Sequence, residues 1–229
     1  MNNIIKNKLL LFSSFFMLVN IYLIFIWVPT EANQGAIQRI LYIHVPVSQI
    51  SMIAIIIVAI SSVLFLLKRN EFWDKIAIAS AEIGLLYGTI MLLSGILWAK
   101  PVWGVWWTGE AKLTTALILY LIYVSYIMFR NYFPIGSQGQ RIAAIIAIIG
   151  ALDTPLIYFA ANLWSEAHPP IVLGPASEND SSFSSSEMRI VWLFSTISFM
   201  IFFVYLLRVR YKLQDNISKY LKITTERPN

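Results

Sequence analysis

The chain has 229 residues, of which 58% are apolar and 13% charged, and its formal net charge is +5. Its mean hydropathy of +0.69 exceeds what one soluble core of this size can hide, so lipid must be its solvent. The basic residues are spread between apolar blocks, which is typical of topology signals and not of nucleic-acid binding. The absence of cysteine excludes disulfides, a thiol nucleophile, thiolate metal ligands and cofactor attachment through a Cys-x-x-Cys-His motif.

Six apolar runs are long enough to cross a hydrocarbon core of ~30 Å, which takes about 20 residues. We therefore expect an all-α membrane protein, a bundle of six transmembrane helices forming one domain over residues 1–229, with a basic cytoplasmic tail at 209–229. The first run lacks a small-residue cleavage site, so we expect it to be retained as a span. The expected spans are roughly residues 9–28, 47–67, 76–98, 113–129, 142–163 and 190–207.

The connections between these spans differ in charge from one side to the other. Those after the first, third and fifth spans hold few cations, namely Arg39, Lys100, Lys112 and Arg189. The positive-inside rule therefore places both termini in the cytoplasm and these three connections outside. The opposite side holds Lys6, Lys8, Lys68, Arg69, Lys75, Arg130, Arg141, Arg208, Arg210, Lys212, Lys219, Lys222 and Arg227.

The three outer connections, residues 29–46, 99–112 and 164–189, contain both histidines and most of the prolines. In the first, the spacing of apolar residues up to His44 predicts a short interfacial helix that ends before Pro46. The third is rich in proline and serine, which favours a mobile loop.

Four indoles lie within ten residues of the second outer connection and the end of the preceding span. If this stretch is helical, Trp103, Trp106 and Trp107 share one face, and Gly104 would let a planar ligand or another backbone come close. An aromatic belt at the end of a span accounts for one or two tryptophans. Four of them, Trp98 included, with Gly and Pro between them, favour a flat aromatic ligand.

His44 and His168 are the only histidines, and each lies near the outer end of a span. Neutral imidazole is a common iron ligand, and one on each side of a porphyrin gives six-coordinate iron. The alternative is that His44 and His168 are two unrelated surface histidines. Both lie on the same predicted side of the membrane as the tryptophans, which favours binding of an iron porphyrin over this alternative.

A porphyrin with propionate groups would also favour cations at the edge of its site. Arg39, Lys100, Lys112 and Arg189 are the whole outer supply of positive charge. Lys100 and Lys112 flank the tryptophans and are the stronger candidates. Interfacial snorkelling is the alternative role for all four.

Two acidic residues lie inside spans, where a bare carboxylate costs at least about 2.5 kcal/mol. Asp153 precedes Thr154 and Pro155, so it could relay protons or ions, or it could satisfy backbone groups freed by a proline kink. For Glu82, hydrogen-bonded packing is the favoured interpretation. Ser80, Gly84 and Gly88 recur every four residues, which predicts a helix-packing face.

The stretch Trp98-Ala-Lys-Pro-Val-Trp103-Gly-Val-Trp106-Trp107, followed by Glu110-Ala-Lys-Leu-Thr, resembles the tryptophan-rich signature of the haem-handling proteins of cytochrome c biogenesis. It is most similar to the haem exporter protein C (CcmC) family. The likeness covers about residues 38–170 and includes Arg39-Ile-Leu-Tyr-Ile-His44-Val-Pro, Pro155-Leu-Ile-Tyr, and Leu163-Trp164 followed by His168-Pro.

The resemblance implies that His44 and His168 are axial ligands of a non-covalently bound b-type haem carried as cargo. It implies a haem platform of Trp103, Gly104, Trp106 and Trp107, with Arg39, Lys100, Glu110 and Lys112 beside it. It further implies a bacterial inner-membrane protein that is not an enzyme and that loads haem onto a membrane-anchored periplasmic haem chaperone. An ABC transporter and a small single-span membrane protein would be its other partners.

The chain departs from the family pattern at three places. Gly109-Glu110 stands where the family usually has Trp-Asp, Lys112 where it has Arg, and Asp153 where a neutral residue is common. The charges at Glu110 and Lys112 are retained.

Two other functions are compatible with the composition. A b-type electron carrier would normally place histidine pairs on spans within the bilayer, and two histidines outside the spans argue against it. A proton- or ion-coupled transporter would centre on Asp153 and Glu82.

Overall fold

The computed structural model describes residues 7–133, 138–163 and 185–225. The expected all-α membrane fold is confirmed, because six helical segments of this part of the chain are long and apolar enough to cross a membrane. The α-helices are α2 (Lys8–Tyr22), α3 (Leu41–Lys68), α4 (Glu71–Trp103), α5 (Ala111–Tyr132), α6 (Gln138–Ala151), α7 (Thr154–Leu163) and α8 (Ser186–Thr225).

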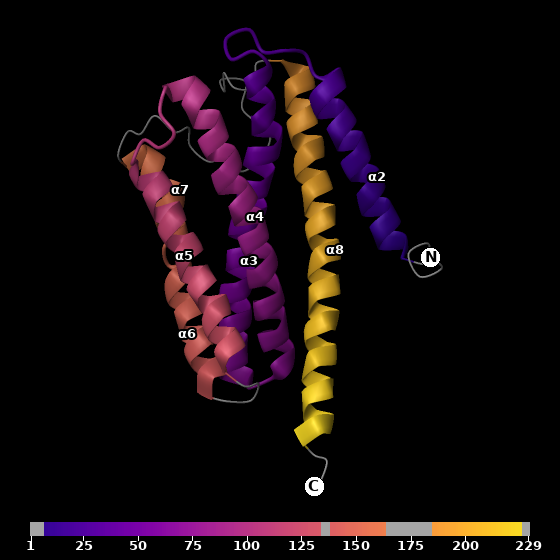
Figure 1. Ribbon diagram of the computed structural model, residues 1–229, viewed down its shortest axis with the longest axis vertical. Helices are drawn as coiled ribbons and strands as arrows, with labels where there is room; N and C mark the ends of the chain where they lie inside the picture. The colour runs from indigo at the N-terminus through magenta and orange to yellow at the C-terminus, as the bar shows by residue number, and fades with distance from the viewer. Residues whose placement is uncertain (1–6, 134–137, 164–184, 226–229) are drawn as a thin grey trace.

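α3 lies at the centre of the bundle and packs against α4, α6 and α8, whereas α2 lies at the edge and packs on α8. Successive spans run in alternate directions, as Figure 1 shows, with α6 and α7 together forming the fifth. The end of α4 and the start of α5 therefore meet at one end of the bundle, here called the tryptophan end. The short α3–α4 turn at Arg69 and Asn70 lies at the opposite end.

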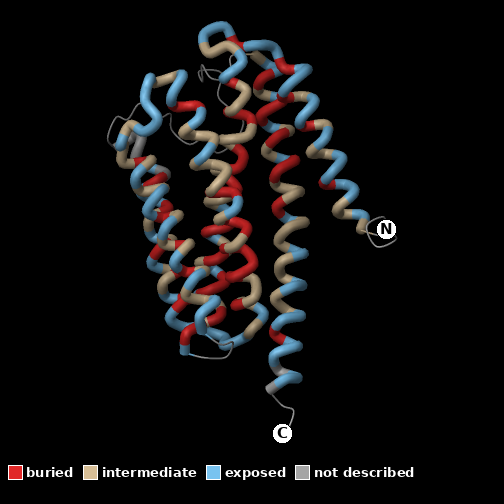
Figure 2. The backbone as a smooth tube through the Cα atoms, viewed as in Figure 1, coloured by how far each residue is buried: buried red, intermediate tan, exposed pale blue. Residues whose placement is uncertain are grey.

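The close contact between α3 and α4 confirms the packing face predicted on the third span. A Cβ atom at Gly84 would lie 3.0 Å from Cβ of Ala54 on α3. Figure 2 shows buried residues concentrated along α3 and α4. Large apolar side chains such as Phe15 and Leu18 of α2 are exposed on the outside, where lipid would cover them.

Four of the helices, α3, α4, α5 and α8, extend at both ends beyond the spans expected from hydropathy. After α2 the chain makes one π-helical turn, Leu23–Trp27. α8 runs unbroken from Ser186 through the region of the expected tail as far as Thr225. At 1.5 Å per residue its 40 residues measure about 60 Å, twice the thickness of a hydrocarbon core.

The prediction of a short interfacial helix that ends before Pro46 was wrong. A 3₁₀ helix, Ala36–Ile40, runs directly into α3, and Pro46 lies inside α3. Proline removes only one backbone donor, and helices packed on neighbours in a membrane tolerate this loss. His44 is therefore a residue of the second span, one turn from its start, and does not lie in the outer connection.

Ion pairs connect α8 with α4 at the end of the bundle opposite the tryptophans. Arg210 Nε donates to Glu82 Oε2 at 2.6 Å, and Lys75 Nζ donates to Asp215 Oδ1 at 2.8 Å. The expectation that Glu82 is hydrogen-bonded within the bundle is thus confirmed. Asp74 Oδ2 accepts hydrogen bonds from Arg130 of α5 at 2.7 Å and from Gln140 of α6 at 2.8 Å.

Replacing Arg130 with Ala should destabilise the bundle by about 3 kcal/mol, because it leaves the Asp74 carboxylate buried without its cation. Thermal unfolding in detergent measures the loss. Lys219→Ala is the matched control, since it breaks an ion pair with Asp215 whose lysine side chain is 68% exposed, and it should shift the midpoint little. Equal shifts in the two variants would contradict a structural role for the Asp74 pair.

Candidate functional site

A cavity of about 160 Å³ lies between α3, α4 and α5 and reaches from the tryptophan end toward the middle of the bundle. Its mouth is lined by Trp103, Trp106, Trp107 and Lys112, and its deep end by apolar residues that include Ile157 of α7. Most of the wall is apolar, and its few polar side chains include those of His44, Ser48 and Lys112. This combination is typical of a small-molecule site.

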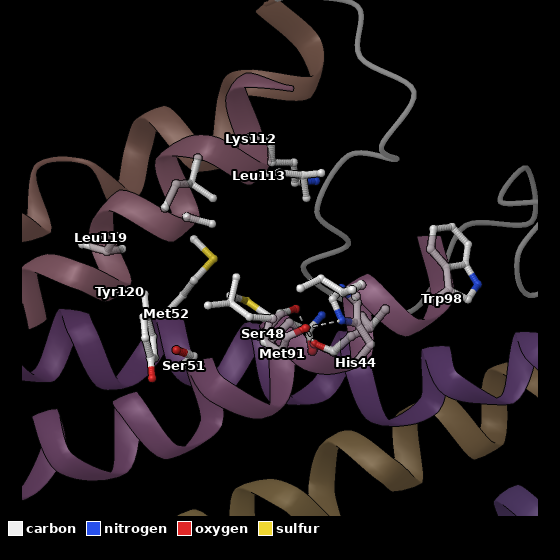
Figure 3. Close-up of a pocket in the computed structure, with 18 of the residues that line it drawn as sticks. His44, Ser48, Ser51, Met52, Met91, Trp98, Lys112, Leu113, Leu119 and Tyr120 are labelled. Carbon is white, nitrogen blue, oxygen red and sulfur yellow. Dashed lines mark hydrogen bonds between the residues drawn. The ribbon is translucent and has the colours of Figure 1, made fainter. Parts of the chain in front are cut away.

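His44 lines the cavity from α3 and is held by α4 (Figure 3). Its Nδ1 lies 3.0 Å from the carbonyl oxygen of Met91 and 3.0 Å from Oγ of Ser94. A carbonyl oxygen can only accept a hydrogen bond, so Nδ1 must be the nitrogen that carries the proton. Nε2 then bears the lone pair, which is the form of imidazole that binds a metal ion.

All four indoles of the tryptophan stretch line the cavity. Trp98 and Trp103 meet edge to face with ring centroids 4.9 Å apart, and Trp98 Nε1 donates to Gln34 Oε1 at 3.2 Å. Trp106 and Trp107 are 55% and 36% exposed. The mouth therefore presents aromatic rings to whatever occupies it.

The condition for a shared helix face of Trp103, Trp106 and Trp107 is not met, because the stretch is not helical throughout. α4 ends at Trp103, because Gly104 adopts a left-handed φ of +79° and its N–H bonds back to the carbonyl of Lys100 at 3.0 Å. Trp106 and Trp107 follow outside the helix, so the irregular chain after Gly104 brings the indoles together. Gly104 therefore ends the helix because glycine adopts a left-handed conformation without strain.

The candidate cations occupy different surroundings. Lys112, in the first turn of α5, is only 5% exposed, and Figure 3 shows it across the cavity from His44. Lys100 is exposed; its Nζ donates to the Gly104 carbonyl at 2.8 Å and lies 5.8 Å from the centroid of the Trp106 ring. Arg39 is not among the cavity residues, and it donates to the Phe25 carbonyl at 2.6 Å.

The departures from the family pattern have local explanations in two places. Gly109 adopts a φ of +74°, a conformation that strains residues with a side chain, and Glu110 is the N-cap residue of α5. Asp153 lies in the break between α6 and α7, where its carbonyl accepts from Ile157 N at 3.1 Å. Its Oδ2 is buried without a hydrogen-bond partner among the residues described.

His168, the second predicted ligand, lies outside the described residues, as does Trp164. The site built here therefore consists of His44, the indoles and Lys112.

Sequence reasoning missed the residues that hold His44, namely Met91, Ser94 and Gly95. A signal was present, because the small-residue stripe through Gly84 and Gly88 continues at helical spacing to Gly95. In the sequence, this row of small residues was explained by helix packing alone. The structure shows in addition that Gly95, at the tryptophan end of the row, faces His44.

The sequence also matches a known protein family. The family described as CcmC, Heme exporter protein C, matches residues 1–223. The chain is 34% identical over 178 residues to Heme exporter protein C of Bradyrhizobium diazoefficiens, covering 77% of this chain and 66% of that one. It is 32% identical over 140 residues to Heme exporter protein C of Escherichia coli K12, covering 61% and 57%.

A ccmC-like mitochondrial protein of Marchantia polymorpha, named for cytochrome c biosynthesis, is 38% identical over 146 residues, covering 63% of this chain and 61% of that one. The matched parts thus span less than two thirds of each of these three relatives. The family match extends over almost the whole of this chain and includes the cavity, His44 and the tryptophan stretch. On this ground, the chain belongs to the heme exporter protein C family.

Proposed function

We propose that the chain binds b-type haem non-covalently at the tryptophan end and delivers it to a membrane-anchored periplasmic haem chaperone during cytochrome c maturation. One observation carries the proposal: His44, whose Nδ1 lies 3.0 Å from the Met91 carbonyl oxygen, lines a cavity whose mouth is formed by indoles and a buried lysine. Membership of the heme exporter protein C family supports haem as the cargo.

In this proposal His44 Nε2 binds one face of the iron and His168 binds the other. Two neutral imidazoles fill both axial positions and leave none for oxygen. The cavity volume of about 160 Å³ is smaller than ligand pockets of about 300–1,000 Å³. The cavity would therefore hold only part of the porphyrin, and Trp106 and Trp107 at the mouth would contact the rest.

The charges of the porphyrin propionates would be balanced chiefly by Lys112. Its side chain is buried in the cavity wall, where water screens a charge less than at the surface. Lys100 would assist from the rim beside Trp106. Arg39 holds the carbonyl of Phe25 at the end of the first span, which supports a structural role for it.

The chain would act as a carrier and not as an enzyme, because exchanging axial ligands requires no covalent bond to the porphyrin. Its place would be the bacterial inner membrane with both termini in the cytoplasm, which the distribution of Lys and Arg supports. ABC transporter subunits and a small single-span protein would be its partners beside the haem chaperone.

The two alternative functions fare differently. Glu82 is engaged by Arg210, which leaves a transporter with Asp153 as its central acid. Because His44 lies inside α3, the argument that both histidines lie outside the spans no longer opposes an electron carrier. The exposed indoles at the mouth instead support transfer of the porphyrin, since an electron carrier gains nothing from releasing it.

Replacing His44 with Ala should weaken haem retention and convert the Soret and α-band spectrum of the haem-loaded protein from six-coordinate to five-coordinate. His168→Ala should do the same, because each variant removes one axial ligand. Asp153→Asn is the control and should leave the spectrum unchanged. Wild-type spectra in both histidine variants would refute the proposed function.

Replacing Lys112 with Met should weaken haem binding about tenfold, the loss expected when one charge-assisted hydrogen bond worth roughly 1.5 kcal/mol is removed. Lys100→Met should cost less, because Lys100 is exposed and bonds to Gly104. Titration with haem and with haem dimethyl ester, which lacks the propionate charges, separates the loss of the lysine charge from the loss of side-chain packing. If Lys112→Met weakens binding of the uncharged ester equally, Lys112 does not act on the propionates.

A further inference from the structure

The imidazole of His44 lies directly against the backbone of α4 at Gly95. A Cβ atom at Gly95 would lie 2.9 Å from Cε1 of His44 and 3.5 Å from its Nδ1. Carbon atoms do not approach this closely without a shift, so alanine at this position would displace the ring. The missing side chain therefore provides the space that the ring occupies.

The same glycine leaves open a path to the carbonyl of Met91. In an α-helix this carbonyl accepts the N–H of the residue four positions later, which is Gly95 itself. A carbonyl oxygen has a second lone pair, and His44 Nδ1 lies 3.0 Å from it. A side chain at Gly95 would push the ring away from this acceptor.

Ser94 provides the second acceptor for the same proton. Its hydroxyl donates to the carbonyl of Ile90 at 2.6 Å, which directs a lone pair of Oγ toward His44 Nδ1 at 3.0 Å. When the hydroxyl proton is used in the bond to Ile90, Ser94 accepts from Nδ1. The Met91 carbonyl requires the proton to lie on Nδ1, and Ser94 can accept the same proton.

We propose that Ser94 and Gly95 are positioning residues for the haem ligand, Gly95 by giving the imidazole its place on α4 and Ser94, with the Met91 carbonyl, by fixing the Nδ1–H tautomer. This inference rests on the proposed function and deepens it. Groups that accept a hydrogen bond from a metal-binding histidine hold its ring and raise its basicity. A more basic imidazole stabilises ferric iron relative to ferrous iron.

The tautomer can be tested without haem. In the His168→Gln variant His44 is the only histidine, so ¹⁵N-histidine NMR of the protein in detergent reports on one ring. We expect one nitrogen signal typical of protonated Nδ1 and one typical of unprotonated Nε2. A proton on Nε2, an average of both tautomers, or an imidazolium would overturn the assignment.

The positioning role is tested on the haem-loaded protein with Gly95→Ala. We expect at least a tenfold loss of haem retention, a shifted low-spin EPR signal, and a higher midpoint potential. Each tenfold loss of ferric relative to ferrous affinity raises the potential by about 59 mV. Ser94→Ala should shift the potential in the same direction but less, because the Met91 carbonyl still accepts.

Gly150→Ala is the matched control, since its new methyl group would lie 2.8 Å from Cγ2 of Ile122 and 3.3 Å from Cε2 of Tyr123, both on α5, and its nearest neighbours include neither His44 nor the residues that hold it. This variant should lose stability but keep the wild-type EPR signal and potential. If Gly95→Ala behaves like Gly150→Ala, the positioning role is refuted while the proposed function stands. If His44→Ala retains six-coordinate haem, the proposed function itself fails, and the NMR result remains a separate test of the tautomer.

Discussion

The contact between α3 and α4 is the constraint on which the site depends. Side chains of α3 bond directly to backbone carbonyls of α4: His44 Nδ1 to Met91, and Ser51 Oγ to Gly84 at 3.1 Å. Such bonds require the two helices to lie close together, and glycines on α4 permit this. In lipid, where apolar surface gives little drive for helix association, close packing and interhelical hydrogen bonds hold helices together. The proposed haem ligand is therefore also part of the packing between these helices.

The two ends of the bundle solve different physical problems. At the end opposite the tryptophans, acidic residues such as Asp74 and Glu82 are satisfied by arginines from other helices. The tryptophan end instead has an apolar cavity, and the lysine in its wall, Lys112, comes from the first turn of α5. Charges that stabilise the fold are thus separated from the charge proposed to meet the cargo.

Hydropathy and charge predicted the six spans, because length and apolar content decide what can cross a bilayer. They also placed the tryptophans, His44 and Lys112 near one another. They failed where a single residue acts through tertiary context. Pro46 suggested a helix end, yet α3 continues through it because its neighbours hold it in place.

Gly104 had the opposite effect, since its left-handed φ ends α4 at Trp103 and leaves Trp106 and Trp107 outside the helix. Ser94 and Gly95 could not be recognised from spacing alone, because their importance lies in what α3 brings against them. Their role appears only when His44 is seen to share Met91 with the backbone of α4.

The length of α8 gives the bundle a mechanical property. An unbroken helix about 60 Å long acts as a lever, so a tilt of about 5° about one end moves the other by roughly 5 Å. α8 is bonded to α4 at two places along its length, where Tyr87 donates to the Phe199 carbonyl at 2.9 Å and Lys75 donates to Asp215 at 2.8 Å. Force applied to the protruding end of this lever is therefore transmitted to α4, the helix that carries Met91, Ser94 and Gly95.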